Sequence, residues 1–215
     1  MVKDLSQTTK KSSSRWDTST YIGDWYQVVG LLVDKEFFVK LLEAINLPKD
    51  ASILEIGIGS GKWSAAFAIM GYKTTAMDMS SEILEQAQRN FPNIKIEYIV
   101  DELPNLTSEA SKRKYDLVFN EGVIEHFLDR NERVAAIRAM GKCCIEGGYV
   151  FFYVPFLSDK EDEHRYTSSK ELFDELADAG LKPVFADFMG IEVTNGGGKP
   201  VDRMHTQLRV VGKKE

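Results

Sequence analysis

An apolar run that contains an acid and ends in three closely spaced glycines is the first candidate for chemistry in this chain. Residues 53–61 read ILEIGIGSG, with Glu55 followed by Gly57, Gly59 and Gly61. Such a run predicts a buried parallel strand that turns sharply into a helix. Glycine has no Cβ, so it adopts positive φ and lets a ligand lie against the backbone. These residues therefore predict a nucleotide-like cofactor at the turn.

The spacing of the glycines separates two classes of cofactor. The dinucleotide fingerprint G-x-G-x-x-G requires a glycine or alanine at position 62, where this chain has Lys62. The third glycine, Gly61, comes one residue early. The spacing therefore disfavours a nicotinamide-dependent oxidoreductase, which we keep as the weaker alternative. A turn that binds nothing is a further alternative.

Acids also stand at the ends of the next two predicted strands. Asp78 lies in the run 73–79, and Asp101 follows the alternating run 94–100. In open α/β sheets the ligand binds beyond the carboxyl ends of the strands, where an ionised carboxylate can accept hydrogen bonds from both hydroxyls of a ribose. The alternative for Asp78 is an N-cap of the following helix, and the alternative for Asp101 is a solvated loop acid.

Alternating strands and helices must position these residues. Apolar patterning predicts strands at 52–57, 73–79, 94–100, 115–120 and 149–154. It predicts helices at 31–45, 60–70, 80–90, 130–145 and 169–179. This alternation implies right-handed βαβ crossovers and a mostly parallel sheet with helices on both faces. Two final strands, at 182–189 and 207–211, lack a helix between them and are predicted to pair as an antiparallel hairpin across a glycine-containing 190–205 connection.

Length and charge limit the class of protein. The chain of 215 residues suffices for one α/β domain, which we assign to 16–215 after a Ser-, Thr- and Lys-rich tail at 1–15 that is predicted to be disordered. Aromatic residues at 16–26 are expected to pack on the core, or alternatively to close over a cofactor. With 27 basic and 33 acidic residues the net charge is -6, so no global positive field attracts nucleic acid or anionic membranes.

The cysteines and the apolar runs indicate the compartment. Cys143 and Cys144 are adjacent in a predicted helix and cannot close a loop together, which favours two buried residues in a reducing compartment over a metal site. No signal-peptide core is present, and the longest apolar run, 149–157, is too short to span a bilayer. We expect a cytoplasmic protein with no membrane partner and no metal.

The motif of Glu55 and the three glycines resembles the first motif of class I S-adenosylmethionine-dependent methyltransferases. The stretch 115–127, YDLVFNEGVIEHF, resembles the fourth motif of the small-molecule branch, which modifies quinones and related metabolites. Together with HRY at 164–166 and the following helix, the resemblance covers roughly residues 50–185. It implies a Rossmann-like, seven-stranded sheet that the C-terminal hairpin completes.

The resemblance also implies how S-adenosylmethionine would be held. Asp78 would bind the ribose, Asp101 the amine of adenine, and Glu102 and Leu103 would flank the adenine ring. The full set of implied cofactor contacts is Glu55, Gly57, Gly59, Gly61, Asp78, Met79, Asp101, Glu102, Asn120 and Glu121. Of these, Asn120 and Glu121 would lie along the methionine part.

The acceptor is expected to be a small molecule that offers oxygen, nitrogen or carbon. The chain lacks the Pro-Pro motif that nucleic-acid amino-methyltransferases carry after strand four, so no nucleic-acid partner is expected. His126 and His164 are the candidate general bases, because an imidazole titrates near neutral pH. The alternative is a structural role for both, and a non-catalytic S-adenosylmethionine-binding module is the alternative function. The residues leave the oligomeric state open.

Overall fold

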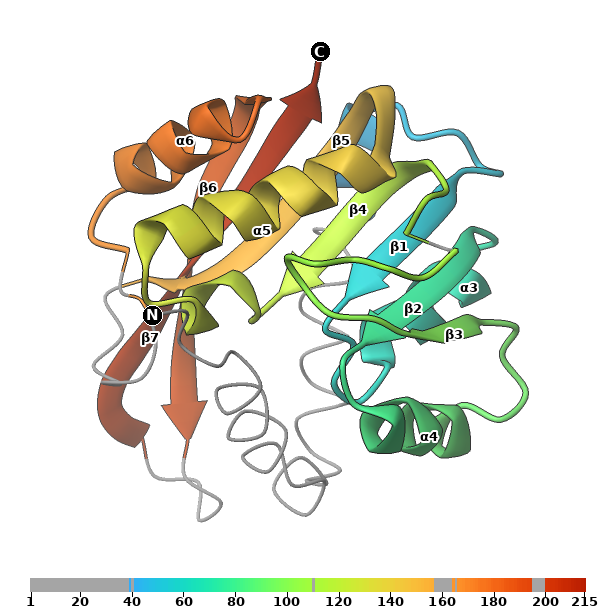
Figure 1. The fold of residues 1–215 in the computed structure, drawn as a ribbon. Coiled ribbons are helices and arrows are strands. Elements are labelled where there is room, and N and C mark those ends of the chain that lie inside the picture. Colours follow the sequence, from blue (N-terminus) through green and yellow to red (C-terminus); the bar gives the residue numbers. More distant parts are fainter. Residues whose placement is uncertain (1–38, 40, 110, 157–163, 165, 195–199) are drawn as a thin grey trace, which may run out of the picture.

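Buried runs of β-branched, aliphatic and aromatic residues form the strands of one sheet. The computed structural model describes residues 39, 41–109, 111–156, 164, 166–194 and 200–215. The sheet in these residues has the order β3-β2-β1-β4-β5-β7-β6, with helices on both faces (Figure 1). The predicted tail, the aromatic segment at 16–26 and most of the predicted helix at 31–45 lie outside the described residues.

Strand and helix alternate along the chain until the last two strands. The strands are β1 (Ser52–Ile56), β2 (Lys73–Asp78), β3 (Glu97–Val100), β4 (Tyr115–Glu121), β5 (Cys144–Phe156), β6 (Leu181–Thr194) and β7 (Pro200–Lys214). The helices are α3 (Lys62–Ile69), α4 (Ser81–Asn90), the short 3-10 helix η2 (Ile124–His126), α5 (Arg130–Cys143) and α6 (Ser169–Asp178). Strands β1 to β5 pair in parallel, whereas β7 runs antiparallel to both β5 and β6. The predicted mostly parallel sheet and its antiparallel closing strand are confirmed.

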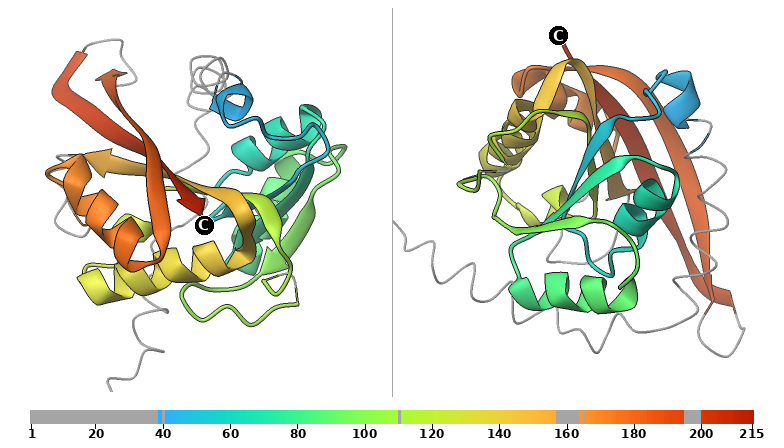
Figure 2. Two further views of the ribbon diagram at one scale, coloured as in Figure 1. Left: turned by 90° about the horizontal axis from the view of Figure 1, so that it is seen from above. Right: turned by 90° about the vertical axis from the view of Figure 1, so that its right-hand side faces the viewer.

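The two faces of the sheet bury separate apolar clusters because side chains alternate along each strand. Leu54 and Ile56 belong to the cluster under α5 and α6, whereas Ile53 packs with residues of α3 and of the helical turn at 41–44. Figure 2 shows α5 and α6 on one side of the sheet and α3 on the other. Phe119 of β4 stacks on Phe151 of β5, with ring centroids 5.1 Å apart.

The boundary between α5 and β5 differs from the prediction. The helix expected at 130–145 ends at Cys143, and β5 begins at Cys144 rather than at Tyr149. The pairing of β4 with β5 shifts in register between Tyr115 and Leu117, so residues 145–148 of β5 form an irregular insertion. Gly147 adopts φ +78° there, and a Cβ on Gly148 would lie 2.9 Å from the carbonyl oxygen of Asp116. The two glycines therefore permit the irregular backbone of this insertion, and they do not end α5.

The closing strands are longer than predicted. Strands β6 and β7 extend well into the expected 190–205 connection, of which only 195–199, including Gly196–Gly198, fall outside the described residues. β-branched residues at 191, 193 and 194 suit this extended backbone. By contrast β3 starts three residues later than expected, at Glu97.

Both cysteines are buried free thiols, as expected for packing residues. Burial raises the pKa of the Cys143 thiol to about 11 and that of the Cys144 thiol to about 12, which keeps both protonated and unreactive near neutral pH. Within the described ranges, no helix has the length and apolar character needed to cross a membrane.

A buried ion pair joins α5 to α6. Arg133 donates from Nη2 to Glu175 Oε1 at 2.7 Å, and the two side chains are 3% and 0% exposed. Tyr166 donates its hydroxyl to Glu175 at 2.9 Å, and Arg133 also donates to the carbonyl oxygens of Phe127 and Leu128. One arginine therefore fixes α6 and the segment that follows η2 relative to each other.

Replacing Glu175 with alanine should destabilise the fold by about 3–5 kcal/mol, because it leaves the Arg133 guanidinium buried without its carboxylate. Asp174→Ala is the matched control: it removes a neighbouring carboxylate of α6, which pairs with Lys170 and is 53% exposed. We expect this control to cost less than about 0.5–1 kcal/mol. Urea unfolding at pH 7 measures the free energy of unfolding of both variants. Equal losses of stability would show that the buried ion pair is not a major contributor to stability.

Candidate cofactor site

The three glycines after β1 have distinct roles. All three adopt positive φ, at +75° for Gly57, +49° for Gly59 and +79° for Gly61. A Cβ on Gly57 would collide with the side chain of Val123, and a Cβ on Gly61 would lie 2.8 Å from that of Ala87 in α4. A Cβ on Gly59 would meet nothing within 4 Å. Two glycines therefore allow close packing, and Gly59 leaves the backbone open to a ligand.

Asp78, at the carboxyl end of β2, reaches the glycine turn. Its carboxylate accepts the backbone N–H of Ser80 at 3.0 Å and also those of Ile58, Gly59 and Met79. Burial raises the pKa of the Asp78 carboxyl, although these four donors favour its charged form. The N-cap of α4 is Ser80, whose side chain accepts from the backbone N–H of Ile83. The alternative that Asp78 caps this helix is therefore wrong.

Glu55 lies under the turn. It is 1% exposed, and its carboxyl group accepts a hydrogen bond from the hydroxyl of Ser64 in α3. Burial raises the pKa of Glu55 to about 8, and the nearby carboxylate of Glu121 adds to this effect. Glu55 therefore joins β1 to α3 in the form of a largely protonated acid at neutral pH.

Asp101 organises the loop that follows β3. Its carboxylate accepts backbone N–H groups of Glu102, Thr107 and Ser108 at 2.9–3.1 Å. Partial burial works to raise the pKa of Asp101, but these hydrogen bonds outweigh it and hold the pKa below its usual value. Glu102 is exposed, whereas the side chain of Leu103 is buried. The predicted contacts of Asp101 and Glu102 with adenine remain predictions.

Two polar residues at the end of β4 lie beside the turn. Asn120 pairs with Ile56 in the sheet and donates from Nδ2 to its carbonyl oxygen at 3.2 Å. Among the described residues, nothing donates to the buried Oδ1 of Asn120. Glu121 binds Lys62 and the indole N–H of Trp63, both in the first turn of α3. Sequence reasoning noted Lys62 only as an interruption of the dinucleotide fingerprint and did not single out Trp63.

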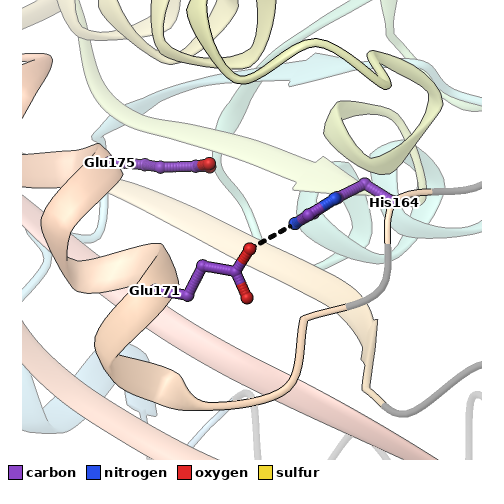
Figure 3. A group of neighbouring side chains, drawn as sticks. All are labelled: His164, Glu171 and Glu175. Carbon is purple, nitrogen blue, oxygen red and sulfur yellow. Dashed lines mark hydrogen bonds and ion pairs between the residues drawn. The ribbon is translucent and has the colours of Figure 1, made fainter.

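The predicted acceptor residues lie beyond the same edge of the sheet. The backbone N–H of His164 donates to the carbonyl oxygen of Glu125 in η2, and its Nε2 lies 2.7 Å from Glu171 Oε1 (Figure 3). Its ring also contacts that of Tyr166, with centroids 4.7 Å apart. His126 is the last residue of η2. The structure thus brings the segments of both histidines together, and Glu171 is a partner of His164 that sequence reasoning missed.

His164, Glu171 and Glu175 each offer a ligand atom, and these atoms lie within 4.8 Å of one another. The set is nevertheless unsuited to a metal ion. Glu175 already pairs with Arg133 and accepts the hydroxyl of Tyr166, so its charge is neutralised and its oxygens are occupied. Figure 3 shows the hydrogen bond from His164 running to Glu171 and not to Glu175.

An apolar hollow of about 480 Å³ lies elsewhere on the molecule. It is lined by Leu41, Ala44, Ile45, Tyr149, Val184, Phe185 and Lys213. Tyr149 of β5 pairs with Lys213 of β7 in the sheet. Tyr149 lies toward the amino end of β5, whereas the glycine turn follows the carboxyl end of the parallel strand β1. The hollow is therefore separate from the candidate site.

Comparison with known proteins identifies the central part of the chain. A family model described as a methyltransferase domain matches residues 53–148. A ubiquinone biosynthesis O-methyltransferase of Proteus mirabilis is 33% identical over 102 residues, which cover 46% of this chain and 40% of that protein. Another protein of this name, from Hydrogenovibrio crunogenus, is 24% identical over 151 residues, or 69% of this chain and 58% of that one. The chain thus aligns with about half the length of these relatives.

Solved structures share the fold. A magnesium protoporphyrin IX methyltransferase from Synechocystis, crystallised with S-adenosylhomocysteine, superposes with a TM-score of 0.66 at 15% identity, covering 87% of this chain and 84% of that one. An S-adenosylmethionine-dependent methyltransferase from Methanosarcina mazei superposes with a TM-score of 0.62 at 21% identity, covering 78% of this chain and 94% of that one.

The domain match, the relatives and the fold agree with the resemblance of the glycine motif and of the β4 segment. The seven-stranded sheet and its antiparallel closing strand are those expected from that resemblance. Residues 53–148 therefore match a methyltransferase domain, and the described chain shares its fold with solved S-adenosylmethionine-dependent methyltransferases.

Proposed function

We propose that this protein transfers a methyl group from S-adenosylmethionine to a small-molecule acceptor. The observation that carries the proposal is the open backbone at Gly59, which lies within reach of the Asp78 carboxylate. A ligand with a ribose can exchange the backbone donors on Asp78 for its own hydroxyls while it lies against a residue without a side chain.

The residues present suit this cofactor. Gly59 provides open space, Asp78 provides the carboxylate for the ribose, and Asn120 provides a buried acceptor that has no donor among the described residues. Bound S-adenosylmethionine supplies an activated methyl group on a positively charged sulfur. The protein then has to orient the acceptor, exclude water and, where the acceptor is protonated, remove its proton.

A hydroxyl oxygen is the acceptor atom that we propose first, because the curated relatives are named O-methyltransferases. For a protonated hydroxyl, His164 is the first candidate base. Glu171 lies 2.7 Å from its Nε2 and can hold the ring in one orientation, while the hydrogen bond to Glu125 fixes its backbone near η2. His126, in η2 itself, is the second candidate.

Asp78→Ala should weaken the binding of S-adenosylhomocysteine by at least about tenfold, because two hydrogen bonds to a charged group contribute roughly 1.5–3 kcal/mol each. Isothermal titration calorimetry measures this, and wild type should show no binding of NAD under the same conditions. Ser80→Ala is the control: it removes the N-cap of α4, so it should lower the melting temperature and leave the affinity nearly unchanged. Unchanged affinity in Asp78→Ala, or tight binding of NAD, would refute the cofactor proposal.

Glu55→Gln tests the protonation of the buried acid. The pKa of Glu55 is about 8 in the folded protein, against an ordinary value of 4.5. Between pH 4.5 and pH 8 the folded state therefore keeps a proton that the unfolded state has lost, and wild type loses stability as the pH rises across this range. The amide cannot ionise. The free energy of unfolding of the variant, relative to wild type, should therefore rise by about 1–3 kcal/mol from pH 5 to pH 8 in urea unfolding.

Glu82→Gln is the matched control for this pH dependence. Hydrogen bonds from its own backbone and from Ser80 hold the pKa of Glu82 below its ordinary value, so this carboxylate is ionised at both pH values. The difference in the free energy of unfolding between Glu82→Gln and wild type should stay constant from pH 5 to pH 8. A constant difference for Glu55→Gln as well would show that Glu55 is ionised in the folded protein.

His164→Ala should lower single-turnover methyl transfer by about 10²-fold or more, as expected for loss of a general base, while calorimetry shows cofactor affinity nearly unchanged. The assay follows radiolabelled methyl groups into a panel of phenols and other hydroxylated compounds. His126→Ala is tested in parallel. Two fully active variants would remove both histidines as bases.

A further inference from the structure

The apolar hollow that lies apart from the candidate cofactor site has the size of a ligand site. Its volume is about 480 Å³, and small-molecule sites typically have volumes of about 300–1,000 Å³. Leu41, Ala44 and Ile45 line it from the helical turn at 41–44 and the residue after it. The remaining lining residues come from the sheet: Tyr149 of β5, Val184 and Phe185 of β6, and Lys213 of β7.

Strand β6 presents two consecutive side chains to this hollow. In a regular strand, successive side chains point to opposite faces of the sheet. The pairing of β6 with β7 shifts in register between Pro183 and Phe185, so Val184 is an extra residue in β6. Such a bulge re-aims a side chain, and here both Val184 and Phe185 line the hollow. They remain 45% and 37% exposed, so the hollow is open to solvent on this side.

The hollow also carries a positive charge. Lys213 is the sheet partner of Tyr149 on one side and of Lys182 on the other. Residues directly opposite each other share a face of the sheet, where like charges are destabilising. Glu215 neutralises Lys182 at 2.7 Å. Among the described residues no carboxylate pairs with Lys213, whose Nζ lies 5.8 Å from the ring centroid of Tyr149. An anion in the hollow would therefore compensate Lys213.

We propose that the hollow binds a single-chain amphipathic anion, namely a monocarboxylate on a hydrocarbon chain. Apart from the ammonium of Lys213 and the hydroxyl of Tyr149, the lining side chains carry no polar atom, so the body of the ligand meets hydrocarbon. The chain covers Val184 and Phe185 and removes their apolar surface from water. The carboxylate pairs with Lys213, which is a single point charge. The second charge of a phosphate group would find no such partner in the lining.

This site is separate from the proposed methyl transfer. Asp78 and Gly59 lie at the carboxyl ends of their strands, whereas Tyr149 and Lys213 lie toward the amino end of β5. A carboxylate bound to Lys213 is therefore not placed to accept a methyl group. The proposal gives the chain a second ligand class, and it does not depend on the identity of the methyl acceptor.

Calorimetry of the full-length chain with decanoate, kept below its critical micelle concentration, tests the charged part of the site. Wild type should bind decanoate at least about tenfold more tightly than decylamine, which has the same chain length and the opposite charge. Lys213→Met keeps an apolar stem without the charge and should weaken the binding of decanoate by about tenfold or more, whereas Lys213→Arg should retain most of it. Lys73→Met, at an exposed position at the amino end of β2, is the matched control and should leave the affinity unchanged.

Val184→Asp tests the apolar part, because it places a carboxylate where the chain of the ligand would lie. It should weaken the binding of decanoate by about tenfold or more. Ile69→Asp, at a position of α3 that is 70% exposed, is the control and should change the affinity by less than about twofold. Thermal unfolding of each variant without ligand distinguishes lost binding from lost folding.

Four results would overturn the proposal. They are the absence of decanoate binding to wild type, equally tight binding of decylamine, unchanged binding in Lys213→Met, and equal losses in Val184→Asp and Ile69→Asp. Displacement of decanoate by S-adenosylhomocysteine would also contradict it, because the two ligands would then share one site. Failure of the proposed function differs from all of these, since the protein would then bind decanoate and not S-adenosylhomocysteine.

Discussion

The site depends on how closely the segment after β4 approaches the turn after β1. Gly57 allows this approach, because any side chain there would occupy the position of Val123. The parallel pairing of β1 with both β2 and β4 aligns the ends of these strands. It brings the carboxyl ends of three strands to one edge, so that Asp78 reaches the glycine turn from one side and Glu121 approaches it from the other.

Charge at this edge is balanced within the protein. Asp78 is compensated by backbone N–H groups, Glu55 by a proton and Glu121 by Lys62 and Trp63. Three acids in so small a volume would otherwise repel one another and lose hydration. Each compensation differs in kind. Protonation leaves Glu55 without a charge, whereas Asp78 keeps its charge beside backbone donors and Glu121 keeps its charge beside Lys62.

The region that carries His126 and His164 is organised by a different constraint, the burial of Arg133 and Glu175 between α5 and α6. Arg133 also holds the carbonyl oxygens that follow η2, and Glu175 holds Tyr166. The segments on which His126 and His164 lie are therefore fixed to the same two helices. This arrangement explains why Glu175 is unavailable to a metal ion although it lies near His164 and Glu171. The packing of the helices thus decides which side chains remain free for chemistry.

The amino-acid sequence by itself determined the alternation of strands and helices, the antiparallel closing strand and the position of the glycine turn, because apolar periodicity and glycine spacing are local properties of a chain. It did not determine the end of α5 or the length of β6 and β7, where pairing with neighbouring strands overrides local signals such as Gly147 and Gly148. The partners of the charged residues were decided only by the tertiary structure. Lys62 and Glu121, 59 residues apart, come together through the sheet register, and no local pattern encodes such a contact. His164 and Glu171 are only seven residues apart, but nothing in that spacing distinguishes a paired carboxylate from a free one.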